Sequence, residues 1–306
     1  DVIRYSSTSL GLGDVYKRQI HKSCRLADES QKLLQNCGIK LTKSKDQLYC
    51  TSLNFPLDIY FIRDDDIPSF VASKVCQIGI VGRNVIKEEQ ILKKNQSIKN
   101  VSLISSLEFG KCRLVIAVPH EFKYEGIKSL QGKVIATSYE GILKDYLHKN
   151  NIICEIVKMN GAVEIAPRIS MADAICDIVS TGTTLAMNGL KEVETILNSQ
   201  AEIICNDSMN NNQKKISERL MLRIRGVQQA DSSKYIMLHS PVKVIDDIIK
   251  VIPGVETPTI LNLKGRNDLV AVHAVCKEGI FWQTMEDLKD RGASSILVLP
   301  IEKILK

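Results

Sequence analysis

The sequence predicts an α/β protein built of two or three units, and three observations support this prediction. Short apolar runs at 134–137 and 174–179 alternate with segments of helical spacing, which is typical of parallel strands covered by helices. The C-terminal part of the chain, 235–299, follows the order β-α-β-β-α-β, which is the pattern of a ferredoxin-like unit. A chain of 306 residues is also long enough to bury more than one core.

Composition narrows the functional classes. Hydrophobic residues make up 44% and charged residues 25% of the chain, as in ordinary globular proteins. The net charge of +6 is spread without a basic block and aromatic residues are only 5%, so we expect no nucleic-acid partner. Nine dispersed cysteines without a C-x-x-C pair indicate reduced thiols, hence a cytoplasmic protein without a cysteine metal site. The longest apolar runs are too short for a membrane span.

The first nineteen residues differ from the rest of the chain. We expect residues 1–19 to be a disordered or non-native extension that partly replaces the first strand. No apolar run typical of a signal peptide is present there. Gly11 and Gly13 do not have the strand before and the helix after that a dinucleotide fingerprint requires. Ordered sequence is therefore expected from Ile20 onward.

A first lobe is expected at 20–101, with a return segment at 187–225. Its strand at 57–62 delivers the acidic turn at 63–66 to a carboxyl end, where α/β folds place ligands. Its other expected elements are a helix at 27–37 that stops at Gly38, a helix beginning with Pro68, a strand at 77–82 and a helix from Asn84.

A second lobe is expected at 102–186 and a third unit at 226–306. The second lobe alternates strands and helices, so a parallel sheet is predicted. Its expected strands are 112–118, 134–137, 153–157 and 174–179, and its helices are 142–149 and 163–171. Beyond it we expect strand structure at 192–204, an exposed loop at 206–215 and an amphipathic helix at 216–227.

The strand at 174–179 leads into Ser180-Thr181-Gly182-Thr183-Thr184, which we interpret as a phosphate cradle. Gly182 permits positive φ, and the hydroxyls and a following helix N-terminus would donate to an anion. An ordinary N-capped turn explains the same pattern equally well. The carboxylate just upstream, Asp177, favours the first reading, because phosphate donors beside a hydroxyl acceptor suit a phosphorylated ribose.

Three other stretches bear on this site. Thr137-Ser138-Tyr139 follows a strand and is by itself best read as a helix cap. Glu164 and Arg168 are four apart, so either a surface ion pair or a sugar-binding role for Glu164 is open. The adjacent carboxylates in 63–66 repel one another, which indicates a cationic or donor-rich partner. Mg²⁺, the side chains of Lys22 and Arg25, or the amino edge of a base are candidates, and a solvated turn is the alternative.

In this order the motifs resemble the long form of the ATP phosphoribosyltransferase family, from about Ile20 to the C-terminus. The motifs that carry the resemblance are Lys22-Ser23-Cys24-Arg25-Leu26, Arg63-Asp64-Asp65-Asp66-Ile67-Pro68, Gly79-Ile80-Val81-Gly82, Ala136-Thr137-Ser138-Tyr139, Val163-Glu164-Ile165-Ala166-Pro167-Arg168, 173–185 and 296–303. The resemblance implies a two-lobed catalytic region similar to periplasmic binding proteins. It also implies that the C-terminal unit is regulatory.

The resemblance further implies the first reaction of histidine biosynthesis, in which N1 of ATP attacks C1 of 5-phosphoribosyl diphosphate. Mg²⁺ would be held mainly through substrate phosphates, histidine would inhibit through the C-terminal unit, and homodimers and homohexamers would form. The implied phosphoribosyl-diphosphate residues are Glu164, Asp173, Asp177, Ser180, Thr181, Gly182, Thr183 and Thr184. The implied ATP residues are Lys22, Arg25, Arg63, Asp64, Asp65, Asp66, Thr137 and Tyr139.

The chain departs from the family pattern in two places, and two rival functions fit the same residues. Cys24 stands where the family usually has glycine, and the leading segment replaces the usual opening strand. A non-catalytic small-molecule sensor is the first rival, because two lobes and a ferredoxin-like unit also suit ligand capture. The second rival is a phosphoribosyltransferase acting on a free base.

Overall fold

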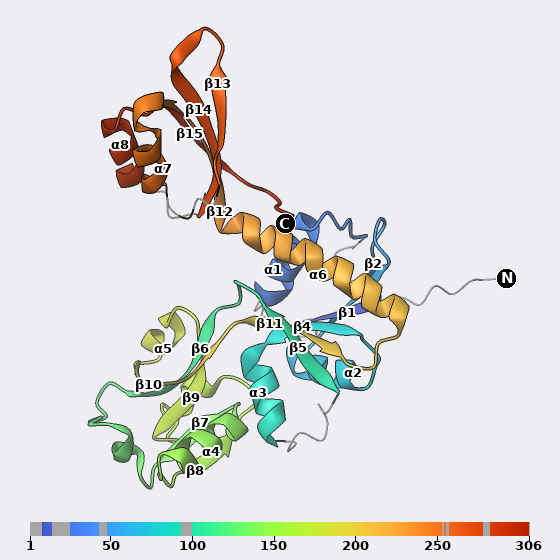
Figure 1. The fold of residues 1–306 in the computed structure, drawn as a ribbon. Coiled ribbons are helices and arrows are strands. Elements are labelled where there is room, and N and C mark those ends of the chain that lie inside the picture. The colour runs from blue at the N-terminus through green and yellow to red at the C-terminus, as the bar shows by residue number, and fades with distance from the viewer. Residues whose placement is uncertain are drawn as a thin grey trace, which may run out of the picture. The chain divides into compact units, whose positions relative to one another are not determined.

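The computed structural model describes residues 8–13, 25–42, 48–92, 100–252, 254, 257–277 and 282–305. The chain forms two compact units, and each is described by itself (Figure 1). The first holds the residues up to Gln35 and Ile39–Ser217, and the second holds Asn36–Gly38 and Glu218–Lys306. None of the described helices is long and apolar enough to cross a membrane.

The first unit contains two sheets, and the first sheet has the strand order β2-β3-β1-β4-β11-β5. Its central strand β4 has four of its five residues buried, as expected for a strand covered on both faces. Gly79 in β4 makes room for a helix, because a Cβ there would lie 2.5 Å from Cγ2 of Ile67 in α2. The strands are β1 (Thr8–Gly13), β2 (Tyr49–Thr51), β3 (Leu57–Ile62), β4 (Ile78–Gly82), β5 (Val101–Ser106) and β11 (Ala201–Asn206).

The helices of the first sheet begin and end close to the predicted residues. They are α1 (Arg25–Asn36), the 3-10 helix η1 (Asp64–Asp66), α2 (Ile67–Ala72) and α3 (Arg83–Leu92). Pro68 lies in the first turn of α2 and Gly38 has a φ of +74° just past α1, so both predicted signals are confirmed. The expected disorder of 1–19 is corrected for six residues, because Thr8–Gly13 pairs in parallel with β3 and β4.

The second sheet of the first unit has the order β10-β6-β9-β7-β8. Three of its strands, β8, β7 and β9, are parallel as predicted, whereas β6 and β10 run antiparallel to their neighbours. The strands are β6 (Cys112–Pro119), β7 (Val134–Thr137), β8 (Glu155–Lys158), β9 (Ala174–Val179) and β10 (Leu190–Ser199). The helices are η2 (Ile127–Leu130), α4 (Glu140–Lys149), η3 (Val163–Ile165) and α5 (Thr183–Met187).

The helix expected at 163–171 is wrong, because only the short η3 forms there and turns follow it. Pro167 supplies the physical reason, since proline lacks the N–H donor that a continuing helix would require at this position. The backbone then closes with a hydrogen bond from Met171 N to Ala166 O at 3.0 Å, and Ser170 takes a φ of +56°. Ala162, immediately before η3, also has left-handed dihedrals (φ +49°, ψ +37°).

The chain passes between the two sheets twice, and this corrects the predicted lobe boundaries. β5 belongs to the first sheet, so the second lobe begins near Cys112 and not at residue 102. The strand pattern at 192–204 is two strands: β10 stays in the second sheet, and β11 returns to the first after Gln200. The crossings are tied together, because Leu107 N donates to Ala201 O at 2.8 Å.

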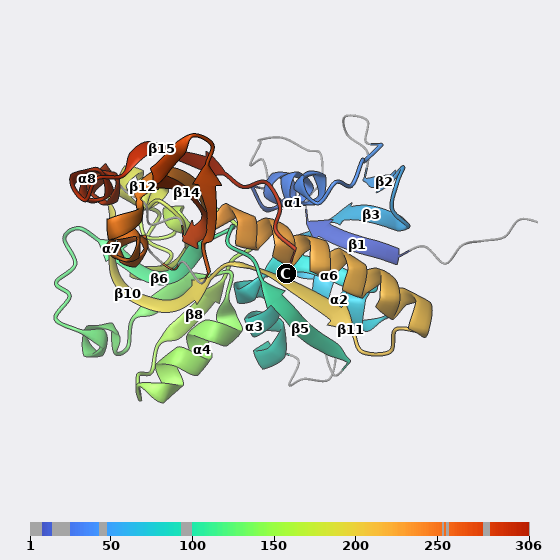
Figure 2. The ribbon, with the colours of Figure 1, turned by 45° about the horizontal axis from the view of Figure 1, so that its top comes forward.

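The second unit confirms the ferredoxin-like prediction. Its four antiparallel strands have the order β13-β14-β12-β15, with α7 and α8 packed on one face (Figures 1 and 2). Its elements are β12 (Ser233–Pro241), η4 (Val242–Val244), α7 (Ile245–Val251), β13 (Thr259–Leu263), β14 (Arg266–Lys277), α8 (Trp282–Asp290) and β15 (Ser294–Pro300). The preceding helix α6 (Asn211–Asp231) starts inside the loop expected at 206–215.

Candidate functional site

The turn between β9 and α5 has the geometry of an open anion cradle. Gly182 is the N-cap residue of α5, with left-handed dihedrals (φ +82°, ψ −6°) that suit glycine. The four flanking hydroxyl residues are exposed, and the Thr181 and Thr183 Oγ1 atoms lie 3.1 Å apart. Gly182 has no side chain that could cap the helix. The first N–H groups of α5 therefore point to the same space as the hydroxyls.

An ion pair behind the cradle was missed by sequence reasoning. Arg113 of β6 donates from Nε and Nη2 to Glu192 of β10 at 2.9 and 2.5 Å, and from Nη1 to the carbonyl oxygen of Ser180 at 3.3 Å. This pairing raises the pKa of Arg113. Glu192 also borders the cradle, because a Cβ on Gly182 would lie 3.3 Å from its Oε1. Arg113 is the sole charged residue in the apolar run 112–118, which is a sequence signal for a special role.

Asp177 lies near the cradle, but Asp173 does not. Asp177 is half-buried in β9, three residues before Ser180, and its Oδ1 accepts from Ile178 N at 2.8 Å. Asp173 precedes β9 at the opposite edge of the sheet, and a six-residue strand separates it from the cradle by roughly 20 Å. There it accepts a hydrogen bond from Val134 N at 2.9 Å and lies 3.7 Å from Lys133. The sugar-facing role expected for Asp173 is therefore corrected to a structural one.

The hydroxyl turn after β7 is closed. Thr137 is fully buried, and its Oγ1 accepts from Tyr139 N at 2.9 Å. The Thr137 side chain is therefore engaged inside the protein. Tyr139 is the N-cap residue of α4, and its hydroxyl accepts a hydrogen bond from Asn84 Nδ2 at 2.9 Å. The side chain of Tyr139 makes no cap hydrogen bond to the helix.

The start of α4 is held by α3, which belongs to the other sheet (Figures 1 and 2). The two carboxylate oxygens of Glu88 accept from Gly141 N at 2.7 Å and Ile142 N at 2.8 Å. Desolvation raises the pKa of Glu88, and these two hydrogen bonds act in the opposite direction. Asn84 is tied to the crossing segment as well, because its backbone N donates to Ser199 Oγ at 3.0 Å.

The acidic turn expected at 63–66 forms η1 at the carboxyl end of β3. Desolvation raises the pKa of Asp65, and the neighbouring Asp66 and Glu89 raise it further, while Arg63 opposes them. Burial raises the pKa of Tyr139, and so do the carboxylates of Asp64, Asp65 and Asp177. The acidic turn and the β9 carboxylate therefore both lie within electrostatic range of one side chain, Tyr139.

The remaining predicted residues are placed less completely. Arg25 is the first residue of α1, and Lys22 and Cys24 lie outside the described residues. Glu164 is half-buried in η3, which packs on the same face of the second sheet as Ile175 and Val179, the neighbours of Asp177 by strand alternation. Within the described part of the chain, no ion pair joins Glu164 to Arg168.

The described residues contain no group of three or more His, Cys, Asp or Glu side chains arranged to hold a metal ion. Mg²⁺ usually keeps several waters and takes one or two carboxylates together with substrate phosphates. The carboxylates of Asp64, Asp65 and Asp177 fit that mode of binding, because they can supplement phosphate oxygens without forming a complete cage.

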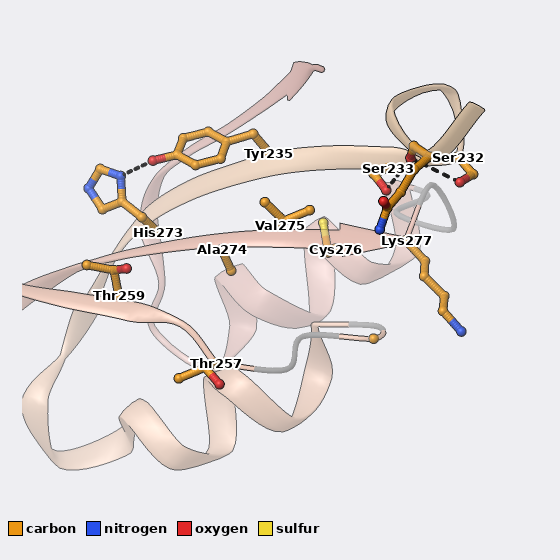
Figure 3. A pocket seen from close by; sticks show the side chains of 12 residues that line it. Ser232, Ser233, Tyr235, Thr257, Thr259, His273, Ala274, Val275, Cys276 and Lys277 are labelled. Atoms are coloured by element: carbon orange, nitrogen blue, oxygen red, sulfur yellow. Dashed lines mark hydrogen bonds between the residues drawn. The ribbon is translucent and has the colours of Figure 1, made fainter. Parts of the chain in front are cut away.

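A second candidate site is a cavity of about 650 Å³ in the C-terminal unit. Figure 3 shows it between the end of α6 and the strands β12 and β14. Tyr235 and His273 mark one side, with the Tyr235 hydroxyl 2.6 Å from Nδ1 of His273. Ser232, Ser233, Thr257, Thr259 and Lys277 also line it, and the Lys277 side chain extends away from Tyr235 and His273 (Figure 3).

The fold defines an α/β protein with two sheets in its first unit and a ferredoxin-like second unit. The family model described as HisG, ATP phosphoribosyltransferase, matches residues 63–226, more than half of the chain, and the model described as HisG, C-terminal domain, matches residues 230–303. The chain belongs to the ATP phosphoribosyltransferase family, the pentosyltransferases of histidine biosynthesis, in its long form.

One solved structure shares the fold, and two further matches have lower TM-scores. An ATP phosphoribosyl transferase (HisG:HisZ) complex from Thermotoga maritima has a chain that is 22% identical, with a TM-score of 0.56 over 71% of this chain and 98% of that one. A histidine kinase sensor domain similar to periplasmic binding proteins is 12% identical, with a TM-score of 0.46 over 74% and 94% of the two chains. A probable amino-acid-binding protein from Bacillus subtilis is 14% identical, with a TM-score of 0.46 over 79% and 93%.

Proposed function

We propose that this chain joins N1 of ATP to C1 of 5-phosphoribosyl 1-diphosphate and releases diphosphate. The observation that carries the proposal is the open N-terminus of α5, where exposed hydroxyls surround Gly182 and the carboxylate of Asp177 lies upstream. The family membership supports the identity of both substrates. Attack by the N1 lone pair needs no strong base, so orienting two anionic substrates is the main demand on the site.

The cradle binds the 5-phosphate in this proposal. N–H groups and hydroxyls of 180–184 donate to the phosphate oxygens, and the dipole of α5 favours the negative charge. Asp177 and Glu164 accept from ribose hydroxyls. On the ATP side we place the turn at 63–66, Tyr139, Arg25 and Lys22, which the family resemblance assigns to that substrate.

Mg²⁺ is proposed as the cofactor, carried mainly on substrate phosphate oxygens. When bound, the ion neutralises charge on the departing diphosphate. The chain's own contribution is to present carboxylates from η1 and β9 to a shared space beside Tyr139. We also propose that the enzyme works in the cytoplasm.

We propose that histidine inhibits the enzyme by binding in the C-terminal unit. The cavity beside Tyr235 suits an amino acid, since Lys277 can pair with a carboxylate and the hydroxyls and His273 can bind an amino group or a ring nitrogen. Any such coupling is reciprocal, so substrates must weaken histidine binding by the same factor. Truncation near residue 226 is a poor test, because it would cut α6. Lys277→Met and Tyr235→Phe are sharper, and both should weaken inhibition while leaving uninhibited turnover unchanged.

We propose homodimers and homohexamers as the working assemblies. The sheet of the C-terminal unit supports this, because the face opposite α7 and α8 carries apolar side chains that are about half exposed. They are Leu261, Val275, Leu297 and Leu299, with exposed fractions of 51%, 45%, 48% and 49%. Neighbouring apolar side chains of this kind mark association surfaces.

The test is an assay with ATP, 5-phosphoribosyl diphosphate and Mg²⁺, followed by product absorbance with and without histidine. Formation of the phosphoribosyl-ATP adduct is expected, and added histidine should slow it. Adenine, orotate and nicotinate should not replace ATP. A folded, oligomeric sample without turnover would overturn the proposal.

A further inference from the structure

We propose that Glu88 of α3 is a positioning residue that, with Asn84, sets the place of Tyr139 between the two sheets of the catalytic unit. This inference rests on the proposed function and adds residues that lie outside the motifs of the family resemblance. Glu88 contacts the second lobe through α4, and Asn84 contacts it through the Tyr139 hydroxyl. Both residues act through Tyr139 and the start of α4, not on substrate directly.

Glu88 provides the anion that the N-terminus of α4 needs. A helix leaves its first N–H groups without intrahelical partners, and a carboxylate is a favourable acceptor there because of the helix dipole. Here the acceptor comes from another helix and another sheet, 53 residues earlier in the chain. Glu88 is 9% exposed, so both of its hydrogen bonds are shielded from water.

Two glycines make this arrangement possible. A Cβ on Gly141 would lie 3.1 and 3.2 Å from the two Glu88 carboxylate oxygens and 3.1 Å from Cγ of Leu92. A Cβ on Gly82 would lie 2.4 Å from Oδ1 of Asn84. The close approach of α3 to α4 and the placement of Asn84 therefore both depend on missing side chains.

Asn84 links the Tyr139 hydroxyl to the chain crossing. Its Nδ2 donates to Tyr139, and its Oδ1 accepts from Ser199 Oγ at 2.7 Å, at the end of β10. Tyr139 in turn lies within the electrostatic range of Asp64 and Asp65 on one sheet and of Asp177 on the other. The contacts of Glu88 and Asn84 therefore fix a side chain, Tyr139, that lies within electrostatic range of carboxylates from both lobes.

The test compares wild type with Glu88→Gln, which keeps the size of the side chain. The amide retains one acceptor and turns its NH₂ group toward an N–H donor, so at least one bond is lost and two donors face each other. We expect kcat/KM to fall about tenfold to a hundredfold, with KM for ATP rising more than KM for 5-phosphoribosyl diphosphate. Hydrogen exchange at the Gly141 and Ile142 amides should become faster.

The matched control is Glu140→Gln, which removes the same charge from the first turn of α4. Glu140 pairs with Lys144 on the surface of the same helix and makes none of the contacts with α3 described above. We expect kcat/KM to change less than about twofold. Gly141→Ala is a second variant, and it should separate α3 from α4 by a few tenths of an ångström and raise KM for ATP in the same direction.

The outcomes show whether Glu88 positions Tyr139 for activity or only stabilises the fold. A Glu88→Gln enzyme that melts earlier but keeps wild-type kcat/KM while folded would overturn the inference. If that variant does not fold, an unchanged KM for ATP in Gly141→Ala would overturn it instead. An inactive wild-type protein would refute the proposed function, and the amide-exchange comparison would then still test the positioning contact.

Discussion

Two hydroxyl-rich turns follow neighbouring parallel strands of the same sheet, and the protein completes them in opposite ways. After β7, Thr137 is buried and the start of α4 is filled by the Glu88 carboxylate. After β9, the residues around Gly182 are exposed, and the N-cap glycine offers no side-chain acceptor to α5. The comparison teaches that composition alone does not identify an anion site. The informative feature is whether the protein already supplies an acceptor at the helix N-terminus.

The ion pair between Arg113 and Glu192 is a further difference between the two turns. Arg113 could have donated directly to a bound anion, but in the described structure it is engaged by Glu192 and by the Ser180 carbonyl. The positive charge therefore steadies the loop and offsets a carboxylate that would repel phosphate. The donors of the open turn are thus backbone N–H groups and hydroxyls, and the Arg113–Glu192 pair stabilises the loop that carries them.

The largest effect is expected from Thr183→Ala combined with Thr184→Ala in the open turn. Each lost hydroxyl removes a hydrogen bond to a charged phosphate, worth about 1.5–3 kcal/mol. KM for 5-phosphoribosyl diphosphate should therefore rise by at least about a hundredfold, which steady-state kinetics will measure. The matched control is Thr42→Ala with Thr51→Ala, another exposed hydroxyl pair with oxygens 3.2 Å apart. Unchanged KM and kcat in the 183/184 variant would show that this turn is only a helix cap.

A smaller loss of affinity for 5-phosphoribosyl diphosphate is expected from Arg113→Met, which removes the partner of Glu192 beside Gly182. Repulsion between that carboxylate and a bound phosphate should raise KM for 5-phosphoribosyl diphosphate about tenfold. Adding Glu192→Gln should restore most of the loss, since the repelling charge is then removed as well. The four enzymes form a double-mutant cycle. Additive effects would show that the pair does not support the cradle.

Local patterns predicted much of this fold. The strands at 57–62, 134–137 and 174–179 were predicted to the residue, because a run of apolar residues bounded by polar turns is a local signal. The start of α6 could have been found as well, since Asn210 and Gln213 form a reciprocal cap with hydrogen bonds of 3.0 and 2.9 Å. The lobe boundary was missed because β5 is a polar strand rich in serine.

The residues of the candidate site also fall into those that local motifs reveal and those that tertiary structure brings together. The hydroxyl loop and the acidic turn were visible as contiguous motifs. Glu88 and Arg113 were not, because their partners lie 53 and 79 residues away in the chain. Asp173 was placed at the sugar because residues four apart share a strand face, although the length of β9 separates Asp173 from the cradle. Pairings that depend on tertiary structure are therefore the part that a single sequence does not reveal.

The stability that Glu88 gives to the closed turn should depend on pH. The pKa of Glu88 is raised in the folded protein from its ordinary value of 4.5, so the native state holds this proton more tightly than the unfolded state. Its contribution to stability is therefore present at low pH and is lost as pH rises from 4.5 through the raised pKa. Denaturant unfolding between pH 4 and pH 8 should show a flatter profile for Glu88→Gln than for wild type. Identical profiles would mean that Glu88 titrates normally.

The smallest effect is expected from Lys144→Met on the exposed surface of α4. Lys144 pairs with Glu140 one turn away, which lowers the pKa of Glu140, so this contribution is present above 4.5 and fades as pH falls below the lowered value. Exposed i,i+4 pairs are worth about 0.3–0.5 kcal/mol, and the change in unfolding free energy at pH 7 should be of that size. The contribution of Glu140 to stability increases with pH, whereas that of Glu88 decreases. The two stability profiles together therefore separate a buried acceptor from a solvated one. A loss as large as that of Glu88→Gln would instead place the surface pair among the contacts that fix α4.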